Sequence, residues 1–353
     1  MKGLILAGGK GTRLRPITHS IAKQLVPIAN KPVIEFGIES LCEAGIKEIG
    51  IIVGDSASEI EEALGDGSRW GAKFTYIPQY APLGLAHAVK TAQDYLDGDK
   101  FIVYLGDNLI KGGVSEFVRE FESCNADASI LLSRVPNPSE FGVAYLENGK
   151  VVRLEEKPKN PTSDYALVGV YLFTPCVFDA IDTLKPSFRG EYEITDAIQT
   201  LIDWGKDVRY HVVTGWWKDT GTVEAILEAN RLILESMQGK VEGEIIDSKL
   251  EGTVIVEGGA KVVRSSIRGP AIIGENAVLE ESFIGPYTSI AKDTRVSHSE
   301  IEYSIVMEGC CIENIPVRLA GCLIGRGVRV ARSDGKPKSL QLVLGDGSSV
   351  MLP

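Results

Sequence analysis

A six-residue repeat of aliphatic side chains in the last third of the chain restricts its fold more than any other feature. The repeat begins near Val241, where helical periodicity ends and short β-branched runs alternate with Gly, Pro, Asn and Asp. One aliphatic residue in six, followed closely by a turn residue, is typical of a hexapeptide β-solenoid, whose coils stack their inward-facing side chains on one another. The in-phase residues are Leu250, Val256 and Val262, then Ile272, Val278, Ile284, Ile290 and Val296, then Ile305, Cys311, Val317 and Leu323.

An ordinary β-sandwich with coincidental spacing is the alternative to the solenoid. The unbroken run of in-phase aliphatic residues from Ile272 to Val296 favours the solenoid. We therefore expect a short hexapeptide-repeat β-helix domain over residues 241–353, with a last strand over residues 340–344.

Residues 1–240 have a different pattern, in which short β-rich runs alternate with helical ones. Strands are predicted over residues 3–7, 48–53, 74–78 and 101–105, and helices over residues 33–44, 58–64 and 85–96. Such alternation is typical of βαβ units, so the fold class is α/β with a Rossmann-like, mostly parallel sheet. Ligands bind at the carboxyl ends of the strands in sheets of this kind, so polar residues at those ends are the candidates for function.

Charge and composition exclude several classes of partner. The net charge of -11 argues against a nucleic-acid-binding surface, which needs clustered Lys and Arg. No apolar run is long enough to span a membrane, and glycines and charges interrupt the N-terminal segment where a signal sequence would lie. The six cysteines have neither zinc-site nor disulfide-framework spacing. We expect a cytoplasmic protein with no nucleic-acid or membrane partner.

A glycine-rich turn follows the first predicted strand. It contains Gly8, Gly9 and Gly11, and then Thr12 and Arg13. Glycines allow backbone N–H groups to approach a phosphate chain, and an arginine can orient phosphate oxygens. The spacing does not fit G-x-x-x-x-G-K-[ST], and Leu14 stands where G-x-G-x-x-G requires its third glycine. On this evidence alone, a tight turn without a ligand is an equal alternative.

The wider motif carries a family resemblance. The segment LAGGKGTRLRP over residues 6–16, followed by KQLVP over residues 23–27 and by Lys31-Pro32, closely resembles the signature of the sugar-phosphate nucleotidyltransferases. The sequence is most similar to the glucose-1-phosphate thymidylyltransferases, in the long form with a C-terminal left-handed β-helix. The resemblance covers essentially the whole chain. It implies Mg²⁺-dependent transfer of a nucleotidyl group from dTTP to glucose 1-phosphate, giving dTDP-glucose and pyrophosphate.

The resemblance assigns a triphosphate site around the glycine-rich turn. Arg13 and Lys23 would be catalytic cations that offset charge developing on the phosphates. A solvated surface lysine is the alternative for Lys23. The remaining nucleotide-binding candidates in this region are Leu6, Ala7, Gly8, Gly9, Gly11, Thr12 and Gln24.

Gln79, Pro82 and Gly84 are the candidates for binding the base. Gln79 ends a predicted strand, and its amide both donates and accepts, which suits the imide edge of thymine or uracil. Gly84 would let the backbone approach the base. Gln79 could equally be a capping or loop residue, and neither residue tests for the thymine methyl group or the ribose 2′-OH.

Two aspartates are the metal candidates, and Asp107 is also counted with the nucleotide. Asp107 follows a buried strand, where an unpaired carboxylate would be costly. Mg²⁺ takes one or two carboxylates and completes its shell with phosphate and water. The resemblance pairs Asp107 with Asp219. A helix N-cap is the alternative for either aspartate, and for Asp219 above all.

The sugar-phosphate side comes from later motifs. The resemblance gives Lys157 to the sugar phosphate, as a third catalytic residue, and Glu156 to the sugar hydroxyls. An exposed charge pair before a proline turn is the alternative for these two. The other candidates on this side are Asn108, Gly142, Val168, Gly169 and Glu191.

The expected reaction is in-line displacement by the sugar phosphate at the α-phosphorus. UTP as donor, another sugar phosphate as acceptor, and a non-catalytic sugar-nucleotide-binding regulatory subunit are the alternatives. We expect small-molecule substrates and a homo-oligomer, with a structural role for the β-helix. Acetyl transfer by the β-helix is a remoter hypothesis, for which His298 is the histidine available in the coils.

Overall fold

The computed structural model describes residues 1–332 and 345–351 and divides them into two units by contact. The sheet unit comprises Met1–Lys10, Ile21–Leu25 and Val33–Asp219. The coil unit comprises Gly11–Ser20, Val26–Pro32 and the described residues from Thr220 onward. The strand predicted over residues 340–344 lies outside the described residues. The predicted domain boundary after residue 240 stays a prediction.

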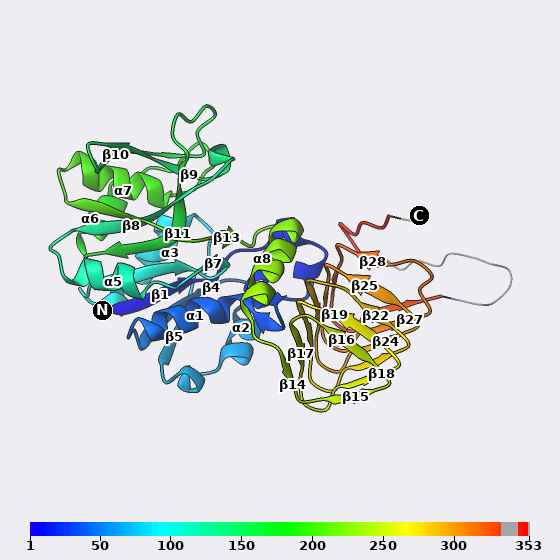
Figure 1. Cartoon of the computed structure of the whole chain (residues 1–353). Helices are drawn as coiled ribbons and strands as arrows, with labels where there is room; N and C mark the ends of the chain where they lie inside the picture. Colours follow the sequence, from blue (N-terminus) through cyan, green and yellow to red (C-terminus); the bar gives the residue numbers. More distant parts are fainter. Residues whose placement is uncertain (333–344, 352–353) are drawn as a thin grey trace. The chain divides into compact units, whose positions relative to one another are not determined.

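Four parallel strands form one half of the large sheet in the sheet unit (Figure 1). They lie in the order β5, β4, β1, β6, so the chain reverses its direction of travel across the sheet between β1 and β6. This reversal is the topological switch point, where open α/β sheets bind ligands. The strands are β1 (Lys2–Leu6), β4 (Glu48–Val53), β5 (Lys73–Pro78) and β6 (Phe101–Leu105), with α1 (Val33–Glu43), α2 (Ala57–Leu64), α3 (Leu85–Thr91) and α4 (Gln93–Leu96) in the connections.

The other half of the same sheet is mainly antiparallel. β11 pairs with β6, β8 and β9, all antiparallel, while β12 runs parallel to β8. A separate two-stranded ribbon joins β7 to β13. These elements are β7 (Asn108–Ile110), β8 (Ala128–Arg134), β9 (Gly142–Glu147), β10 (Lys150–Glu156), β11 (Tyr165–Phe173), β12 (Val208–Val212), β13 (Trp217–Asp219), α5 (Ser115–Glu122), α6 (Cys176–Asp182) and α7 (Ile194–Asp203).

The predicted α/β class is confirmed, and two strands have the predicted bounds. β4 and β6 are almost wholly buried, and their apolar runs therefore mark them clearly in the sequence. The helix predicted over residues 85–96 is instead two helices, which meet at Ala92.

Short strands of two or three residues form the coil unit, after the long helix α8 (Val223–Ser236). They build three parallel sheets, which fit a left-handed β-helix and confirm the predicted solenoid (Figure 1). The strands are β14 (Lys240–Val241), β15 (Glu244–Ile246), β16 (Lys249–Glu251), β17 (Val254–Val256), β18 (Lys261–Val263), β19 (Ser266–Arg268), β20 (Ala271–Ile273), β21 (Val278–Glu280), β22 (Phe283–Ile284), β23 (Thr288–Ile290), β24 (Arg295–Ser297), β25 (Glu300–Glu302), β26 (Ile305–Val306), β27 (Cys311–Glu313), β28 (Leu319–Ala320), β29 (Leu323–Ile324) and β30 (Arg329–Ala331).

The predicted phase of the repeat is correct in part. Most coils advance by 17 residues, as between Ser248 and Ser265, because one corner in each coil is a residue shorter than the others. A strict period of six therefore drifts. The core contains the predicted residues Val256, Val262, Ile284, Ile290 and Val296. At four positions it contains the next residue along the chain, so that Ile273, Leu279, Val306 and Ile312 replace the predicted Ile272, Val278, Ile305 and Cys311. Likewise, Ile324 packs against the core in place of the predicted Leu323.

Two of the out-of-phase residues have other surroundings. Ile272 packs in a separate small cluster with Ala29 and Leu234. Val317 is 43% exposed and lines the outer surface of the coils.

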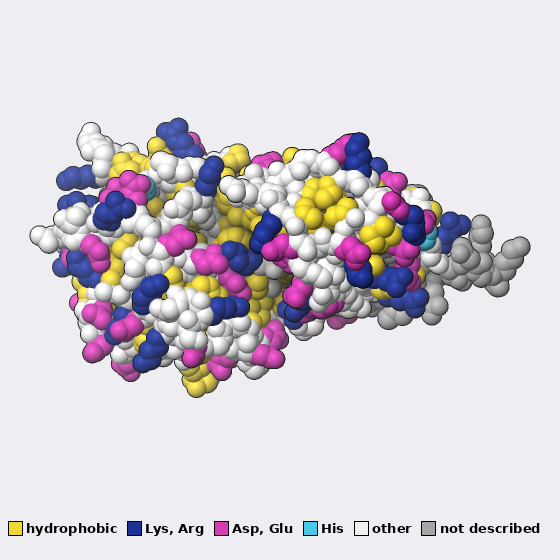
Figure 2. Space-filling model, turned by 60° about the horizontal axis from the view of Figure 1, so that its bottom comes forward, with side chains coloured by type: hydrophobic (Ala, Val, Ile, Leu, Met, Phe, Trp, Pro, Cys, Tyr) yellow, Lys and Arg dark blue, Asp and Glu magenta, His cyan; other side chains and the backbone are white. Residues whose placement is uncertain are grey.

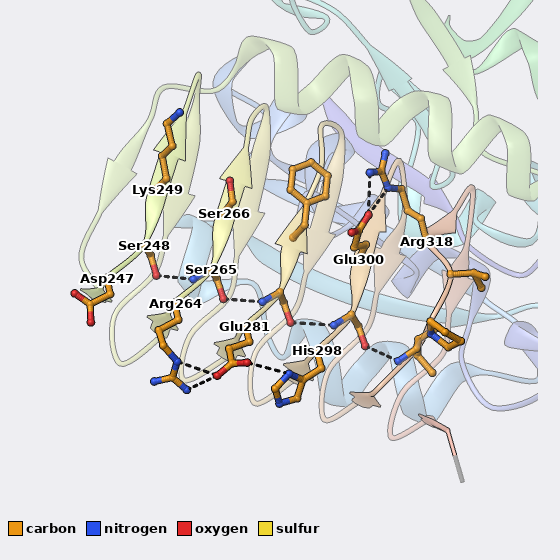
Figure 3. Close-up of a pocket in the computed structure, with 16 residues that line it drawn as sticks. Asp247, Ser248, Lys249, Arg264, Ser265, Ser266, Glu281, His298, Glu300 and Arg318 are labelled. Atoms are coloured by element: carbon orange, nitrogen blue, oxygen red, sulfur yellow. Dashed lines mark hydrogen bonds and ion pairs between the residues drawn. The ribbon is translucent and has the colours of Figure 1, made fainter. Parts of the chain in front are cut away.

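A ladder of serines runs along the short corners (Figure 3). Each hydroxyl oxygen accepts the backbone N–H of a residue in the next coil. The bonds run from Ser265 N to Ser248 Oγ at 2.9 Å, from Ser282 N to Ser265 Oγ at 3.0 Å, from Ser299 N to Ser282 Oγ at 3.4 Å and from Ile315 N to Ser299 Oγ at 3.1 Å.

A hairpin from the start of the chain is part of the coil unit. It comprises β2 (Pro27–Ile28) and β3 (Lys31–Pro32), and its turn residues Ala29 and Asn30 both have positive φ. The fully buried Asn230 of α8 accepts the Ala29 N–H at 2.8 Å, and Asn30 donates to the Ile290 carbonyl at 2.9 Å.

Within the described residues, no helix combines the length and apolar character that a membrane crossing requires. All six cysteines are free thiols.

Candidate active site

The carboxyl ends of the central strands bring the predicted nucleotide residues of the sheet unit together. β1 ends in the buried Leu6 and Ala7 and leads into Gly8 and Gly9. The Ala7 N–H donates to the Ile52 carbonyl at 2.8 Å, which keeps this segment extended beside β4. β6 leads into Gly106 and Asp107 on the other side of β1.

Gly8 and Gly9 lie close to two of the predicted side chains. A Cβ added at Gly8 would lie 3.0 Å from Oε1 of Gln79, and one added at Gly9 would lie 2.9 Å from Cε of Lys23. A larger residue at Gly9 would therefore displace Lys23. The glycines, Lys23 and Gln79 form one cluster, as the sequence predicted.

Lys23 and Asp107 form an ion pair beneath this cluster. The Lys23 ammonium contacts Oδ2 of Asp107, and the two side chains are 19% and 10% exposed. Burial alone would raise the pKa of Asp107, but the charge of Lys23 and hydrogen bonds from Lys23 and Asn108 outweigh it and hold the pKa below its usual value. Asp107 is therefore a carboxylate at neutral pH, and Lys23 is not a solvated surface lysine.

Asp219 lies beside this pair through the ribbon of β7 and β13. Its partner in the antiparallel register is Asn108, the residue after Asp107. Asn108 Nδ2 donates to Asp107 Oδ1 at 3.2 Å, and Asn108 Oδ1 accepts from the Trp217 indole at 2.5 Å. Asp219 is not an N-cap, because α8 begins after Thr222, whose hydroxyl accepts the Ala225 N–H at 3.2 Å.

The residues at this point suit a hard divalent cation. Asp107 and Asp219 supply two carboxylates on adjacent positions, the number with which Mg²⁺ is commonly held beside phosphates. Next to Gly106 lies Gln24, which is 1% exposed and whose Oε1 accepts no hydrogen bond within the described residues. A buried acceptor of this kind calls for a donor or cation from a ligand or water. No group of three or more His, Cys, Asp and Glu side chains that could hold a metal occurs among the described residues.

The predicted sugar-phosphate residues gather on the antiparallel half of the sheet. Gly142 pairs with Glu156 across β9 and β10, and the Lys157 N–H donates to the Phe141 carbonyl at 3.0 Å. Lys157 has a φ of 44°, a left-handed conformation that a non-glycine residue rarely adopts. On β11, the buried Val168 is followed by Gly169, whose added Cβ would lie 2.6 Å from Leu105 at the end of β6.

Arg189 and several carboxylates form a second charged cluster. Arg189 Nη1 lies 3.4 Å from both Glu156 and Glu193, and its Nη2 lies 3.2 Å from Glu191. Burial, and then the nearby Glu193, raises the pKa of Glu156. The pKa of Glu193 is also raised, again mainly by burial. Glu156 is thus part of a partly buried cluster, whereas Lys157, the other member of the alternative charge pair, is exposed.

Glu193 is a member of this cluster that was not among the predicted site residues. This residue is 3% exposed, is the N-cap of α7 and accepts from the Ser187 hydroxyl at 2.9 Å. It lies two residues after Glu191, in the segment RGEYEITD that resembles the family pattern. The available signal was therefore the motif, which did not separate the two glutamates. Asp196 lies within the first turn of the same helix.

The loop with Pro82 and Gly84 is tied to the segment before α7. The Tyr192 N–H donates to the Leu83 carbonyl at 2.8 Å, and the Ala86 N–H donates to the Tyr192 carbonyl at 3.1 Å. Gly84 has a φ of 106°, and a Cβ there would meet the Tyr192 backbone. Gln79 Nε2 lies 3.0 Å from Nδ1 of His87 on α3. These contacts give the candidate base loop a defined conformation.

Three predicted phosphate residues are counted with the coil unit. Gly11 has a φ of 61° and precedes a short 3-10 helix, Thr12–Leu14, which contains Arg13. The Thr18 hydroxyl donates to the Gly11 carbonyl at 2.7 Å. The division into units thus falls inside the glycine-rich turn, after Lys10, and the phosphate-binding roles of Gly11, Thr12 and Arg13 stay predictions.

A surface groove of about 950 Å³ runs beside the serine ladder of the coil unit (Figure 3). His298 there is half exposed, with its Nδ1 3.2 Å from Glu281, and Glu281 is also bound by Arg264 at 2.9 Å. Figure 2 shows basic and acidic side chains interspersed over the visible face. The charges of His298, Glu281 and Arg264 in the groove are paired and solvated, and they give acetyl transfer no specific support.

Comparisons with known proteins agree with this geometry. The model of the nucleotidyl transferase family matches residues 2–236. A Streptomyces griseus protein named glucose-1-phosphate thymidylyltransferase is 52% identical over 354 residues, which cover 100% of this chain and 99% of that protein.

Two solved structures have similar folds. A Bacillus anthracis protein assigned as a glucose-1-phosphate thymidylyltransferase, solved in complex with sucrose, is 40% identical with a TM-score of 0.64, and the match covers 68% of this chain and 98% of that one. UDP-glucose pyrophosphorylase complexed with UDP-glucose is 27% identical with a TM-score of 0.60, over 67% of this chain and 99% of that one.

Proposed function

The chain belongs to the nucleotidyl transferase family, and we propose that it transfers the thymidylyl group of dTTP to glucose 1-phosphate, releasing dTDP-glucose and pyrophosphate. One observation carries the proposal. Gly9, Lys23 and Asp107 are in contact at the switch point of the sheet, with Asp219 on the adjacent strand position. This places backbone N–H groups, a cation and two carboxylates at one point, as a metal-bound triphosphate requires.

The reaction is in-line displacement at the α-phosphorus. A phosphate oxygen of glucose 1-phosphate forms the new P–O bond, and the electron pair of the broken bond leaves with pyrophosphate. The nucleophile is already an anion, so no general base is needed. Lys157 holds the attacking phosphate, while Arg13, Lys23 and the glycine-rich turn, including Thr12, hold the leaving group.

The proposed cofactor is Mg²⁺, held by Asp107 and Asp219. Bound there, it would neutralise charge on the phosphates during the displacement. Asn108 orients Asp107 through its amide hydrogen bond. Gln24, with a buried oxygen that lacks a partner in the described residues, would accept from the bound nucleotide.

Gln79, Pro82 and Gly84 would bind the base, beside the extended backbone of Leu6 and Ala7. The sugar would be bound by Asn108, Gly142, Glu156, Val168, Gly169 and Glu191. No residue among these recognises the thymine methyl group, so uridylyl transfer is the closest alternative, and the similarity to UDP-glucose pyrophosphorylase supports it as runner-up.

A non-catalytic regulatory subunit is a weaker alternative. Such a protein can lose a metal carboxylate or a phosphate-binding cation without loss of function, whereas this chain retains Arg13, Lys23, Asp107, Lys157 and Asp219. We further propose a catalytic domain over residues 1–240, a β-helix domain over residues 241–353 that supports assembly into a homo-oligomer, and a cytoplasmic location.

Pyrophosphate release from a panel of triphosphates tests the proposed function. With glucose 1-phosphate and Mg²⁺, we expect dTTP to give the highest kcat/KM, and chelation of the metal to stop release. A higher value for UTP would favour the runner-up. Binding of dTDP-glucose without turnover of any triphosphate would favour the regulatory alternative.

A further inference from the structure

The side-chain amide of Gln79 has a defined orientation, because its two ends face different neighbours. Nε2 lies 3.0 Å from Nδ1 of His87. Oε1 faces the glycine-rich turn, since a Cβ added at Gly8 would lie 3.0 Å from it. The backbone of Gln79 is held as well, because its N–H donates to the Val53 carbonyl at 2.8 Å.

His87 is placed for this contact by the helix that follows the base loop. α3 begins at Leu85, directly after Gly84, and His87 is half-buried in its first turn. A carboxamide nitrogen can only donate, so Nδ1 of His87 accepts, and the imidazole proton is on Nε2. The pair therefore leaves Oε1 of Gln79 as the acceptor on the side of the glycine-rich turn.

An acceptor in that position suits one class of base. Thymine and uracil carry an N3–H between two carbonyl groups, so Oε1 can accept from N3 while the second amide hydrogen reaches a carbonyl. Cytosine has an acceptor at N3, and the same amide orientation would oppose two lone pairs. A rotation of 180° about χ3 exchanges the amide oxygen and nitrogen and so reverses these preferences. In an unrestrained glutamine the two orientations are similarly populated, because this terminal torsion is roughly two-fold.

We propose that His87 is a specificity-determining positioning residue, which fixes the Gln79 amide so that the site selects a pyrimidine with an N3–H and rejects cytosine. The inference rests on the proposed function, because it requires Gln79 to contact the base. It does not depend on the choice between dTTP and UTP, whose N3 edges are alike.

Changing the hydrogen-bonding character of residue 87 tests the inference. His87→Phe keeps an aromatic ring but removes the acceptor, so the amide can turn. We expect the ratio of kcat/KM for dTTP to that for dCTP to fall about tenfold or more, mainly through the KM for the triphosphate, because a mispaired polar edge is what excludes the wrong base. Pyrophosphate release with glucose 1-phosphate gives both constants.

A second pair of variants predicts changes of opposite sign. His87→Lys offers a donor only and would hold the amide in the reversed orientation, so dCTP should gain on dTTP further than in the phenylalanine variant. His87→Gln can accept again and should restore most of the wild-type ratio. A merely structural contact between α3 and β5 would lower both rates alike and would not produce this order.

Thr91→Val is the matched control on the same helix. The Thr91 hydroxyl donates to the backbone carbonyl of His87 at 2.9 Å and does not touch its ring. This variant should keep the wild-type ratio, and circular dichroism should show native folding in all variants.

The outcomes separate the inference from the proposed function. A wild-type protein that releases pyrophosphate with neither dTTP nor UTP overturns both. If the wild type is active, and the phenylalanine and lysine variants have the same ratio of kcat/KM for dTTP to that for dCTP as the wild type, the inference alone is overturned. Calorimetric binding of dTTP and dCTP gives the same ratio for any variant that is too slow to assay.

Discussion

Both units contain parallel strand pairs, but they distribute their polar groups in opposite ways. The sheet unit has strands of up to nine residues, joined by helices, and its polar side chains collect where the strands end. The coil unit has strands of two or three residues, and its corner serines each bind the next coil. A repeating fold spreads its polar groups evenly, whereas an open α/β sheet concentrates them at one edge.

Gathering polar and charged side chains at one edge of the sheet has an electrostatic cost that the coil unit avoids. Asp107 and Lys23 are largely removed from water. Burial raises the pKa of both Glu156 and Glu193, and the charge of Glu193 raises that of Glu156 further. Ion pairs in the coil unit, such as Arg264 with Glu281, are solvated. We therefore expect substitutions in the sheet unit to affect activity first, and those in the coil unit to affect stability first.

The largest effect should follow loss of a metal carboxylate. Asp219→Asn should lower kcat by roughly a thousandfold or more with little loss of stability, because the group that holds Mg²⁺ at the phosphates is removed. Asp107→Asn should lower kcat similarly but also destabilise the fold, since Lys23 loses its partner. Pyrophosphate release and thermal melts measure both effects. Exposed Asp94→Asn is the control, and near-normal Mg²⁺-dependent turnover in Asp219→Asn would contradict the assignment.

A smaller loss of activity should follow removal of the cation on the sugar-phosphate side. Lys157→Ala should lower kcat/KM for glucose 1-phosphate by about a hundredfold and leave the KM for dTTP nearly unchanged. The reason is that the sugar phosphate loses the cation beside it, whereas the phosphates of dTTP keep theirs. Exposed Lys159→Ala, two residues away, should have little effect. Equal losses in the two variants would mean that Lys157 has no special contact.

In the coil unit, a core substitution should have the reverse profile. Ile284 is fully buried between Ile267 and Ile301, so Ile284→Ala should cost about 2–5 kcal/mol of unfolding free energy in denaturant melts while turnover at 25 °C is retained. Val317→Ala, at a 43% exposed position, should change it by no more than about 0.5 kcal/mol. Similar costs for both variants would contradict the inward assignment of Ile284.

The smallest expected effect concerns the carboxylate cluster. The pKa of Glu193 is raised above its ordinary value of 4.5, so its contribution to stability is present below that pH and is lost as pH rises through the raised pKa. The melting temperature of Glu193→Gln minus that of the wild type should therefore be about 2 °C greater at pH 7.5 than at pH 4.5. Exposed Glu147→Gln should show no such change between the two pH values, and an equal shift in both would rule out the buried charge as its cause.

The sequence predicts most of what long apolar runs and strand ends determine. β4 and β6 have the predicted bounds, and Gln79 and Asp107 follow the carboxyl ends of parallel strands, where Lys23 contacts Asp107. Partnerships between elements were not predictable in the same way. His87 reaches Gln79, and Arg189 joins Glu156 from 33 positions away, only because separate elements fold against one another.

The predicted phase of the repeat was wrong in part of the coils for a local reason. Each short corner contains a left-handed residue, namely Asp247, Arg264, Glu281 or His298. Such a conformation is most often indicated by Gly or Asn and, less strongly, by Asp or His, so Arg264 and Glu281 gave no warning and Asp247 and His298 only a weak one. The signal that would have found the corner is the serine that follows each of them, which recurs every 17 residues.

The buried hairpin turn has a consequence for the order in which the protein can be made. Ala29 is bonded to a residue 201 positions further along the chain, and Asn30 to one 260 positions further. At ordinary rates of synthesis the ribosome needs roughly 10–50 s to cover such a distance. For that interval the turn waits without its partners while the sheet unit emerges, so the coil unit is completed only when a segment made early meets residues made much later.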